Sequence, residues 1–229
     1  GINLRSNRFY LAMINMLYRH YDKVICVSCK LKGELKDVLG VDCEVVPLPM
    51  KLELYRPKEL TEREDVVVHI GTSPVKNPQI SIEAVKILKR RGHHVRLVII
   101  GSSTMPSFSE NIEHVYRASR KKVMEILCNA KALVLPSSYE ALPYVVLEAM
   151  ACGTPVVVSN AISEEVVVGN FNGIRVDSFN PEDYANALEN LLKHEELWMK
   201  LSRYSFEFVK QFDYIEIAKK YIGVIHEFL

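Results

Sequence analysis

The stretch ALVLPSSYEALPYVVLEAMACGTPVVVS, residues 132–159, contains a complete strand–helix–strand unit. The runs ALVLP and TPVVVS are short and apolar, which is typical of strands buried on both faces of a sheet. Between them, YVVLEAMACG has the composition and length of a helix. Neighbouring parallel strands need such a crossover connection, so this stretch predicts part of a parallel sheet.

The same alternation occupies most of the remaining chain. Strands are predicted at 23–28, 43–49, 66–70, 94–101, 113–116 and 173–176, and helices at 6–20, 29–40, 77–92 and 119–130, with three more helices in the tail. The expected N-caps are Ser28, Asn77, Ser119, Asn180 and Asp213, because their side chains can accept a hydrogen bond from a first-turn amide. Strands that alternate with helices of this length predict an α/β, Rossmann-like fold with a doubly wound parallel sheet.

Composition excludes several classes of protein. The 229 residues carry a formal net charge of +1, so no overall field favours nucleic acid or an anionic membrane. No apolar run approaches the ~20 residues that cross a bilayer. The beginning, GINLRSNRFY, lacks both an initiator Met and the layout of a signal peptide, which suggests a cut or processed end.

The five cysteines are an odd number without the spacing of a four-ligand zinc site. Cys26 and Cys29 form a C-x-x-C, which can mark redox or metal chemistry. The favoured interpretation is that the thiols are structural and that the compartment is reducing.

Three loops follow strands of the predicted sheet, at the edge where such sheets bind their ligands. They are GTSPVKN (71–77), GSST (101–104) and SSYEALP (137–143). In the last loop, Pro143 opens a helix, so the amides of residues 144–146 are expected to be available to a phosphate. Lys76 can bring an ammonium group to the same anion.

Two glutamates border this last loop. Glu148 lies among apolar neighbours, where an ionised carboxylate costs several kcal/mol unless a partner compensates it. Glu140 precedes the helix and is better suited to a neutral, hydroxyl-rich group than to a phosphate. The pair therefore favours a ligand with hydroxyls at both ends and negative charge between them, such as a nucleotide sugar.

At these residues the sequence resembles the retaining glycosyltransferases of family four (glycosyltransferases group 1), which have the GT-B fold. PSSYEALPYVVLEAMACGTPVVVS carries the E-x7-E pattern of that family, and EEVVVGNFNGIRV and FDYIEIAKKY are similar to its later segments. The resemblance runs from about Asp22 to the C-terminus. It implies that residues 1–48 are the last part of an N-terminal acceptor domain, 49–64 an interdomain linker, 65–210 the nucleotide-sugar-binding domain and 211–229 a crossing helix.

The resemblance also implies a donor site and a reaction. Glu140 would contact hydroxyls of the donor sugar, Glu148 the ribose and Lys76 the diphosphate, with Glu140 and Lys76 as the catalytic residues and the base near residues 116–118. The complete expected donor site is Gly71, Thr72, Lys76, Arg117, Glu140, Ala141, Leu142, Pro143, Tyr144, Val145 and Glu148. The donor would be a nucleotide diphospho-sugar such as UDP-glucose or GDP-mannose, whose hexose is transferred with retention, without a cofactor or an obligatory metal.

The implied partners are the donor and an acceptor sugar or lipid-linked glycan, with no role for nucleic acid. An N-terminal domain would complete the cleft, so this chain alone is expected to be an incomplete, inactive fragment. The expected location is cytoplasmic, with a peripheral position at the inner membrane surface as the alternative for a longer protein.

Two positions depart from the family pattern. Gly71 is followed by Thr72 where the family usually has arginine, which leaves one cation for two phosphate charges. The family's Gly-Gly-x-Pro-Glu loop is NAISEE (160–165) here, of which only the glutamate, Glu165, is retained. His69, at the end of a strand, is expected to be a satisfied core residue rather than a phosphate ligand.

Two other functions remain open at this point. A non-catalytic nucleotide-sugar-binding or regulatory subunit would use the same site without transferring a sugar. A dinucleotide-dependent oxidoreductase would share the topology, but VVVHIGTSPVKN lacks the G-x-G-x-x-G that such enzymes carry after the first strand.

Overall fold

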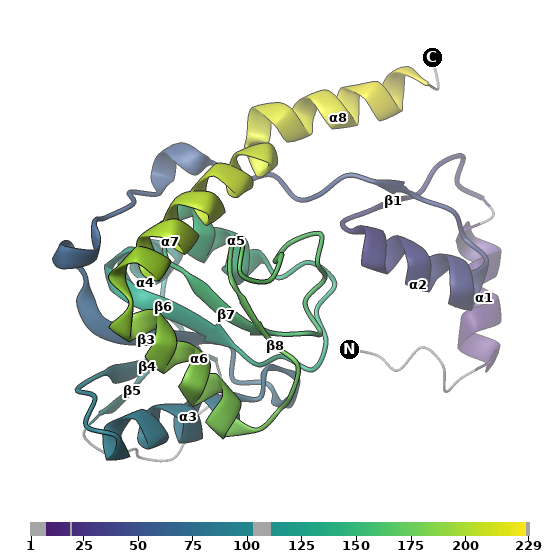
Figure 1. The fold of residues 1–229 in the computed structure, drawn as a ribbon. Coiled ribbons are helices and arrows are strands. Elements are labelled where there is room, and N and C mark those ends of the chain that lie inside the picture. Colours follow the sequence, from purple (N-terminus) through teal and green to yellow (C-terminus); the bar gives the residue numbers. More distant parts are fainter. Residues whose placement is uncertain (1–7, 19, 103–110, 228–229) are drawn as a thin grey trace. The chain divides into compact units, whose positions relative to one another are not determined.

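The computed structural model describes residues 8–18, 20–102 and 111–227, which form two compact units (Figure 1). Unit 1 comprises residues 1–50 and 211–229, and unit 2 comprises residues 51–210. Of the predicted loop GSST, Ser103 and Thr104 lie outside the described residues, as do residues 6, 7 and 19 of the first predicted helix.

Unit 2 is built on a six-stranded sheet in which every neighbouring pair of strands is parallel, and this confirms the predicted α/β fold. The strand order is β5-β4-β3-β6-β7-β8. The bounds are β3 Glu64–Ile70, β4 Arg96–Gly101, β5 Ile112–Tyr116, β6 Ala130–Leu135, β7 Val156–Ser159 and β8 Ile174–Val176. The chain starts in the middle at β3, builds outward to β5, and then returns to β6 on the other side of β3. The carboxyl ends of β3 and β6 therefore flank the point where the sheet changes direction.

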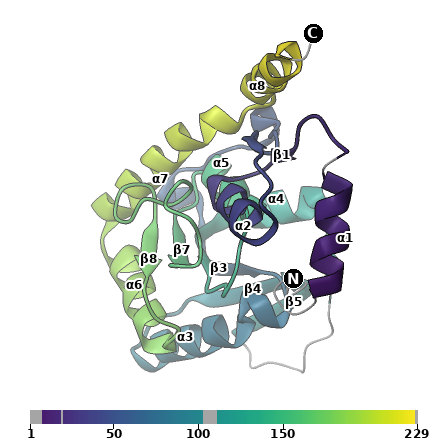
Figure 2. The ribbon, with the colours of Figure 1, turned by 90° about the vertical axis from the view of Figure 1, so that its right-hand side faces the viewer.

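Helices cover both faces of this sheet. On one face, α3 (Pro78–Arg90) lies beside α6 (Pro181–Lys193), as Figures 1 and 2 show. The core beneath this pair of helices includes Val67, Leu97 and Val134, one residue from each of three strands. The other face carries α4 (Arg120–Asn129), α5 (Tyr144–Ala151) and α7 (Glu195–Val209).

Most predicted caps are present. The side chains of Ser28, Ser119, Asn180 and Asp213 each accept a hydrogen bond from an amide in the first turn of the following helix. The prediction for Asn77 is wrong in one respect. Asn77 precedes α3, but its side chain makes no cap bond, because its amide Nδ2 donates to the carbonyl of Pro136 instead (2.8 Å).

Of the predicted linker, 49–64, residues 51–64 belong to unit 2. They contain two short 3₁₀ helices, η2 (Leu52–Leu54) and η3 (Leu60–Glu62). Near the end of this segment, Arg63 is 7% exposed and stacks on the ring of Trp198 at 4.8 Å. Its guanidinium donates to the carbonyls of Lys58, Ala130, Cys152 and Gly153 and to the hydroxyl of Thr154. Arg63 thus joins the segment to the end of α5 and the beginning of β6.

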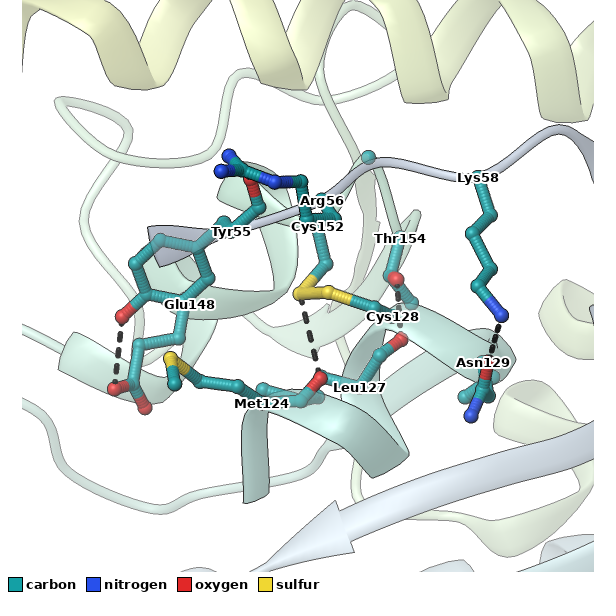
Figure 3. Close-up of a disulfide and its surroundings, with 12 residues drawn as sticks. Tyr55, Arg56, Lys58, Met124, Leu127, Cys128, Asn129, Glu148, Cys152 and Thr154 are labelled. Atoms are coloured by element: carbon teal, nitrogen blue, oxygen red, sulfur yellow. Dashed lines mark hydrogen bonds between the residues drawn. A yellow bond between two sulfur atoms is a disulfide. The ribbon is translucent and has the colours of Figure 1, made fainter. Parts of the chain in front are cut away.

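A disulfide joins Cys128, in the last turn of α4, to Cys152, just after α5 (Figure 3). The prediction that the cysteines are structural thiols is therefore wrong for these two, since their spacing in the sequence carries no signal of the pairing. Cys26, Cys29 and Cys43 take part in no disulfide.

Unit 1 contains a small parallel β-α-β motif. Strand β1 (Ile25–Cys26) pairs with β2 (Glu44–Val45), and α2 (Cys29–Leu39) connects them. The Cys43 thiol donates to the sulfur of Cys26, so the buried neighbour of Cys26 is Cys43 rather than the C-x-x-C partner Cys29.

The remaining elements of unit 1 are helices α1 (Arg8–Tyr18) and α8 (Tyr214–His226), and the 3₁₀ turn η5 (Lys210–Phe212) precedes α8. The backbone of Met50 bonds to Phe212 and Tyr214, which fixes the start of α8 beside the end of the β-α-β motif. None of the helices in the described part of the chain is long and apolar enough to span a bilayer.

Candidate donor site

Two loops at the carboxyl ends of β3 and β6 are bonded to each other. The first, 71–77, contains the 3₁₀ turn η4 (Pro74–Lys76), and the second is 136–143. The carbonyl of Val75 accepts from the amide of Ser138 (2.8 Å) and from its hydroxyl (3.2 Å). With the bond from Asn77 to the Pro136 carbonyl, these contacts hold the two predicted site loops side by side.

The same loops bring together the two residues that the sequence predicts as catalytic. Lys76 Nζ lies 2.5 Å from Glu140 Oε1, and the two side chains are 24% and 10% exposed. Gly71 makes room for this pair, because a Cβ at that position would lie 2.7 Å from the Lys76 side chain. Its φ of 110° is also a conformation that favours glycine. A cation and an acid that can each turn to a ligand therefore meet where the sheet changes direction.

His69 is a buried histidine that braces the first loop from below. Its Nε2 lies 2.8 Å from the Gly71 carbonyl, which can only accept, so Nε2 carries the proton. Nδ1 then accepts from the hydroxyl of Ser81 on α3, also at 2.8 Å. The sequence interpretation of His69 as a satisfied core residue is consistent with this geometry, and the bond to Gly71 adds a role in holding the loop.

Burial lowers the pKa of His69 from 6.5 to about 4. In the unfolded chain His69 takes up a proton below pH 6.5, whereas in the folded chain it stays neutral down to about pH 4. Stability is therefore complete above pH 6.5 and falls as the pH decreases through this window. From pH 7.5 to pH 5, His69 alone is expected to cost about 2 kcal/mol of unfolding free energy.

Urea unfolding at these two pH values measures this loss. The matched variant is His69→Gln, which has no imidazole to titrate and should lose less stability over the same interval. Equal losses in the wild type and the variant would contradict the assignment.

A cavity of about 390 Å³ opens at the carboxyl ends of β3, β4 and β5. Its walls include Gly71, Thr72 and Arg117, which are three of the predicted donor-binding residues. The Thr72 side chain lies directly over Gly101, where an added Cβ would collide with it. Arg117 has a left-handed backbone (φ 49°), and its exposed guanidinium lies over the Tyr116 ring at 5.2 Å. The cavity therefore has a cation in its wall even though residue 72 is not an arginine.

Glu148, on α5, is 7% exposed and has two partners (Figure 3 shows the first). The Tyr55 hydroxyl donates to Glu148 Oε1 at 3.1 Å, and Arg120 Nε lies 3.8 Å from the same oxygen. Burial raises the pKa of Glu148, while the bond from Tyr55 and the charge of Arg120 act in the opposite direction. Glu148 is therefore a buried acid with the compensating partners that its apolar surroundings require.

The first turn of α5 differs in part from the prediction. Pro143 immediately precedes the helix as its N-cap, and Ala141 and Leu142 connect it to Glu140. The amide of Val146 already donates to the Pro143 carbonyl (2.9 Å), so the prediction is wrong for this amide. A ligand phosphate would have to bind the earlier amides, such as that of Val145.

The segment NAISEE (160–165) lies in the turn after β7, and Arg175 of β8 braces it. The Arg175 guanidinium donates to the carbonyls of Asn160, Ile162 and Val167. This loop thus has a fixed backbone without the two glycines of the family pattern.

Sequence reasoning missed Tyr55 and Arg120. Tyr55 lies in the segment predicted as a linker, and it is 93 positions from the glutamate that it contacts. The available signal was the apolar surrounding of Glu148, which requires a buried partner but does not say which residue supplies it.

Residues 52–208 match the family described as Glycosyl transferases group 1. This chain belongs to that family. Its GT-B fold, expected from the resemblance, is confirmed by solved glycosyltransferase structures. Sucrose-phosphate synthase from Thermosynechococcus elongatus matches with a TM-score of 0.83 at 20% identity, covering 100% of this chain and 63% of that one. Anabaena HepE in complex with UDP and glucose also has a TM-score of 0.83, at 17% identity, covering 97% of this chain and 68% of that one.

One curated protein similar to this chain is the GDP-mannose-dependent alpha-(1-6)-phosphatidylinositol dimannoside mannosyltransferase of Mycobacterium tuberculosis. That protein is 26% identical over an alignment 194 positions long, which covers 77% of this chain and 51% of the relative. The chain therefore spans about half the length of this curated relative.

Proposed function

We propose that this chain supplies the donor site of a retaining glycosyltransferase: it binds the nucleotide diphospho-sugar whose hexose the complete enzyme transfers to an acceptor with retention of configuration. The Lys76–Glu140 pair, at the change of direction of the sheet, is the observation that carries this proposal. Family membership and the names of the relatives, which mention GDP-mannose and UDP, support a nucleotide-linked donor.

The pair has the chemistry that the donor requires. A diphosphate attracts the ammonium group of Lys76 more strongly than a single carboxylate does, because it carries more negative charge. Glu140 is then free to accept hydrogen bonds from the hydroxyls of the sugar. As the bond between sugar and diphosphate breaks, Lys76 stabilises the negative charge that develops on the leaving group. The acceptor attacks from the same face, which preserves the anomeric configuration.

Arg117 is the candidate for the second cation. It lies in the wall of the cavity opposite the position where the family usually carries arginine, and its exposed guanidinium can turn from Tyr116 toward a phosphate. Glu148 supplies the acceptor for the ribose, and the amide of Val145 lies in the first turn of the helix that carries it.

Titration calorimetry with UDP, GDP, UDP-glucose and GDP-mannose tests the proposal. We expect saturable binding of the nucleotides of one base. Glu148→Ala should weaken binding about 30-fold, the effect of losing hydrogen bonds to a charged group. The matched control is Glu125→Ala, which removes an exposed acid of α4 that pairs with Lys122.

Absence of binding by all four ligands, or saturable binding of a nicotinamide dinucleotide, would contradict the proposed function. Binding with no sugar transfer by the longer protein would favour the non-catalytic subunit instead. The observation that favours the non-catalytic subunit is Thr72, because its side chain, which lies over Gly101, brings no charge to the position where the family usually has arginine.

A further inference from the structure

Tyr55 connects the segment before the sheet to the acid of α5. The residue is 2% exposed, and its amide, which directly follows η2, donates to the carbonyl of Leu52 at the start of that turn (3.0 Å). Downstream, Lys58 bonds to Asn129, and Arg63 anchors the same segment to the sheet. The position of the Tyr55 hydroxyl is therefore fixed from both sides.

The hydroxyl lies in a short chain of hydrogen bonds. Arg120 Nη2 donates to the Tyr55 oxygen at 3.4 Å. The Tyr55 hydroxyl in turn donates to Glu148 Oε1 at 3.1 Å, the bond drawn in Figure 3. Burial raises the pKa of Tyr55 to about 12, so the hydroxyl is protonated at neutral pH and can donate.

Both contacts of Glu148 use the same oxygen. Tyr55 and Arg120 approach Oε1, and within the described residues Oε2 accepts no hydrogen bond. A glutamate side chain has three rotatable bonds, and fixing them after a ligand arrives would reduce affinity. With Oε1 held, Oε2 is already in place to accept from a ligand.

We propose that Tyr55 is a positioning residue for the ribose of the donor: its hydroxyl fixes Glu148 so that Oε2 accepts from a ribose hydroxyl. This inference rests on the proposed function, which assigns Glu148 to the ribose. It extends the donor site into residues 51–64, outside the strand-end loops. Tyr55 does not touch the ligand and acts only through the carboxylate.

The experiment compares ribose and deoxyribose forms of one nucleotide. Calorimetry gives the affinity of the wild type and of Tyr55→Phe for UDP or GDP, whichever binds, and for its 2′-deoxy and 3′-deoxy analogues. In the wild type, one deoxy analogue should bind about 10-fold more weakly, because a hydrogen bond to a carboxylate is lost. In Tyr55→Phe this ratio should fall to about 2-fold or less, since a loosely held acid discriminates poorly.

The matched control is Tyr184→Phe. Tyr184 is also fully buried in unit 2, and no group in the described residues bonds to its hydroxyl. Its removal should leave the ratio unchanged. A second test compares the single variant Glu148→Gln with the double variant that also carries Tyr55→Phe. Once the carboxylate is absent, the change at Tyr55 should have no further effect on the ratio of ribose to deoxyribose affinity.

The outcomes separate the two proposals. If the wild type binds no nucleotide, the proposed function fails and this inference fails with it. If the wild type binds and discriminates, but Tyr55→Phe keeps the full ratio, only the positioning role is overturned. Equal weakening of the ribose and deoxyribose forms in Tyr55→Phe also overturns it, because that is the result of a purely structural tyrosine.

Discussion

Replacement of Arg63 by methionine is expected to lower the free energy of unfolding by about 3–5 kcal/mol. Burial lowers the pKa of Arg63 to about 10, so the guanidinium is still charged at neutral pH. Methionine fills much of the same volume but donates no hydrogen bonds. Buried carbonyls such as those of Ala130 and Cys152 would then lose their bonds from Arg63.

Urea unfolding of the whole chain, monitored by fluorescence of Trp198, measures this change. Arg56→Met is the control, because Arg56 is exposed and bonds only to nearby carbonyls of its own segment. It should change the unfolding free energy by less than about 0.5 kcal/mol. Arg63→Lys should fall between the two, since lysine keeps the charge but has fewer donors. A loss below about 1 kcal/mol for Arg63→Met would contradict the proposed role of Arg63.

Lys76→Met is expected to weaken the binding of a nucleoside diphosphate about 100-fold or more, if the chain binds donors as proposed. The variant removes the cation next to the phosphate. It also removes the cation beside the Glu140 side chain, which is only 10% exposed, and the acidic group then repels the same phosphate. Titration calorimetry with UDP and GDP gives the change in affinity.

Lys86→Met is the matched control, because Lys86 lies in the same unit and pairs with Glu83 on the exposed side of α3. Its affinity should remain within about 2-fold of the wild type. The double variant Lys76→Met with Glu140→Gln should recover part of the lost affinity, because the repelling charge is gone. A Lys76→Met variant that is less stable but binds with unchanged affinity would show that the ion pair is only structural.

The sequence was informative about the sheet because its strands are continuous apolar runs that can be recognised one at a time. The order of these strands also determined which loops meet. GTSPVKN and SSYEALP follow β3 and β6, and neighbouring parallel strands place their carboxyl ends at one edge. Lys76 and Glu140 could thus be named together although 64 positions separate them.

Contacts that depend on the packing of particular side chains could not be predicted. Asn77 was expected to cap α3, and its side chain would suit that role, but the carbonyl of Pro136 competes for it across two loops. Tyr55 and Arg120 reach Glu148 from segments with no periodic pattern in common. The partner of Cys152 likewise depends on how α4 and α5 pack, which a spacing of 24 residues does not reveal.

The disulfide between Cys128 and Cys152 closes a covalent ring that contains both glutamates of the site. Ser138 and Tyr139, beside Glu140, are exposed on that ring, Tyr139 with 40% of its surface accessible. If a protease cut the backbone there, the ring would still join the two pieces, and Glu140 and Glu148 would stay in one molecule. Only reduction would release the pieces, so the oxidation state of this one bond decides whether a nicked chain remains a single covalent molecule.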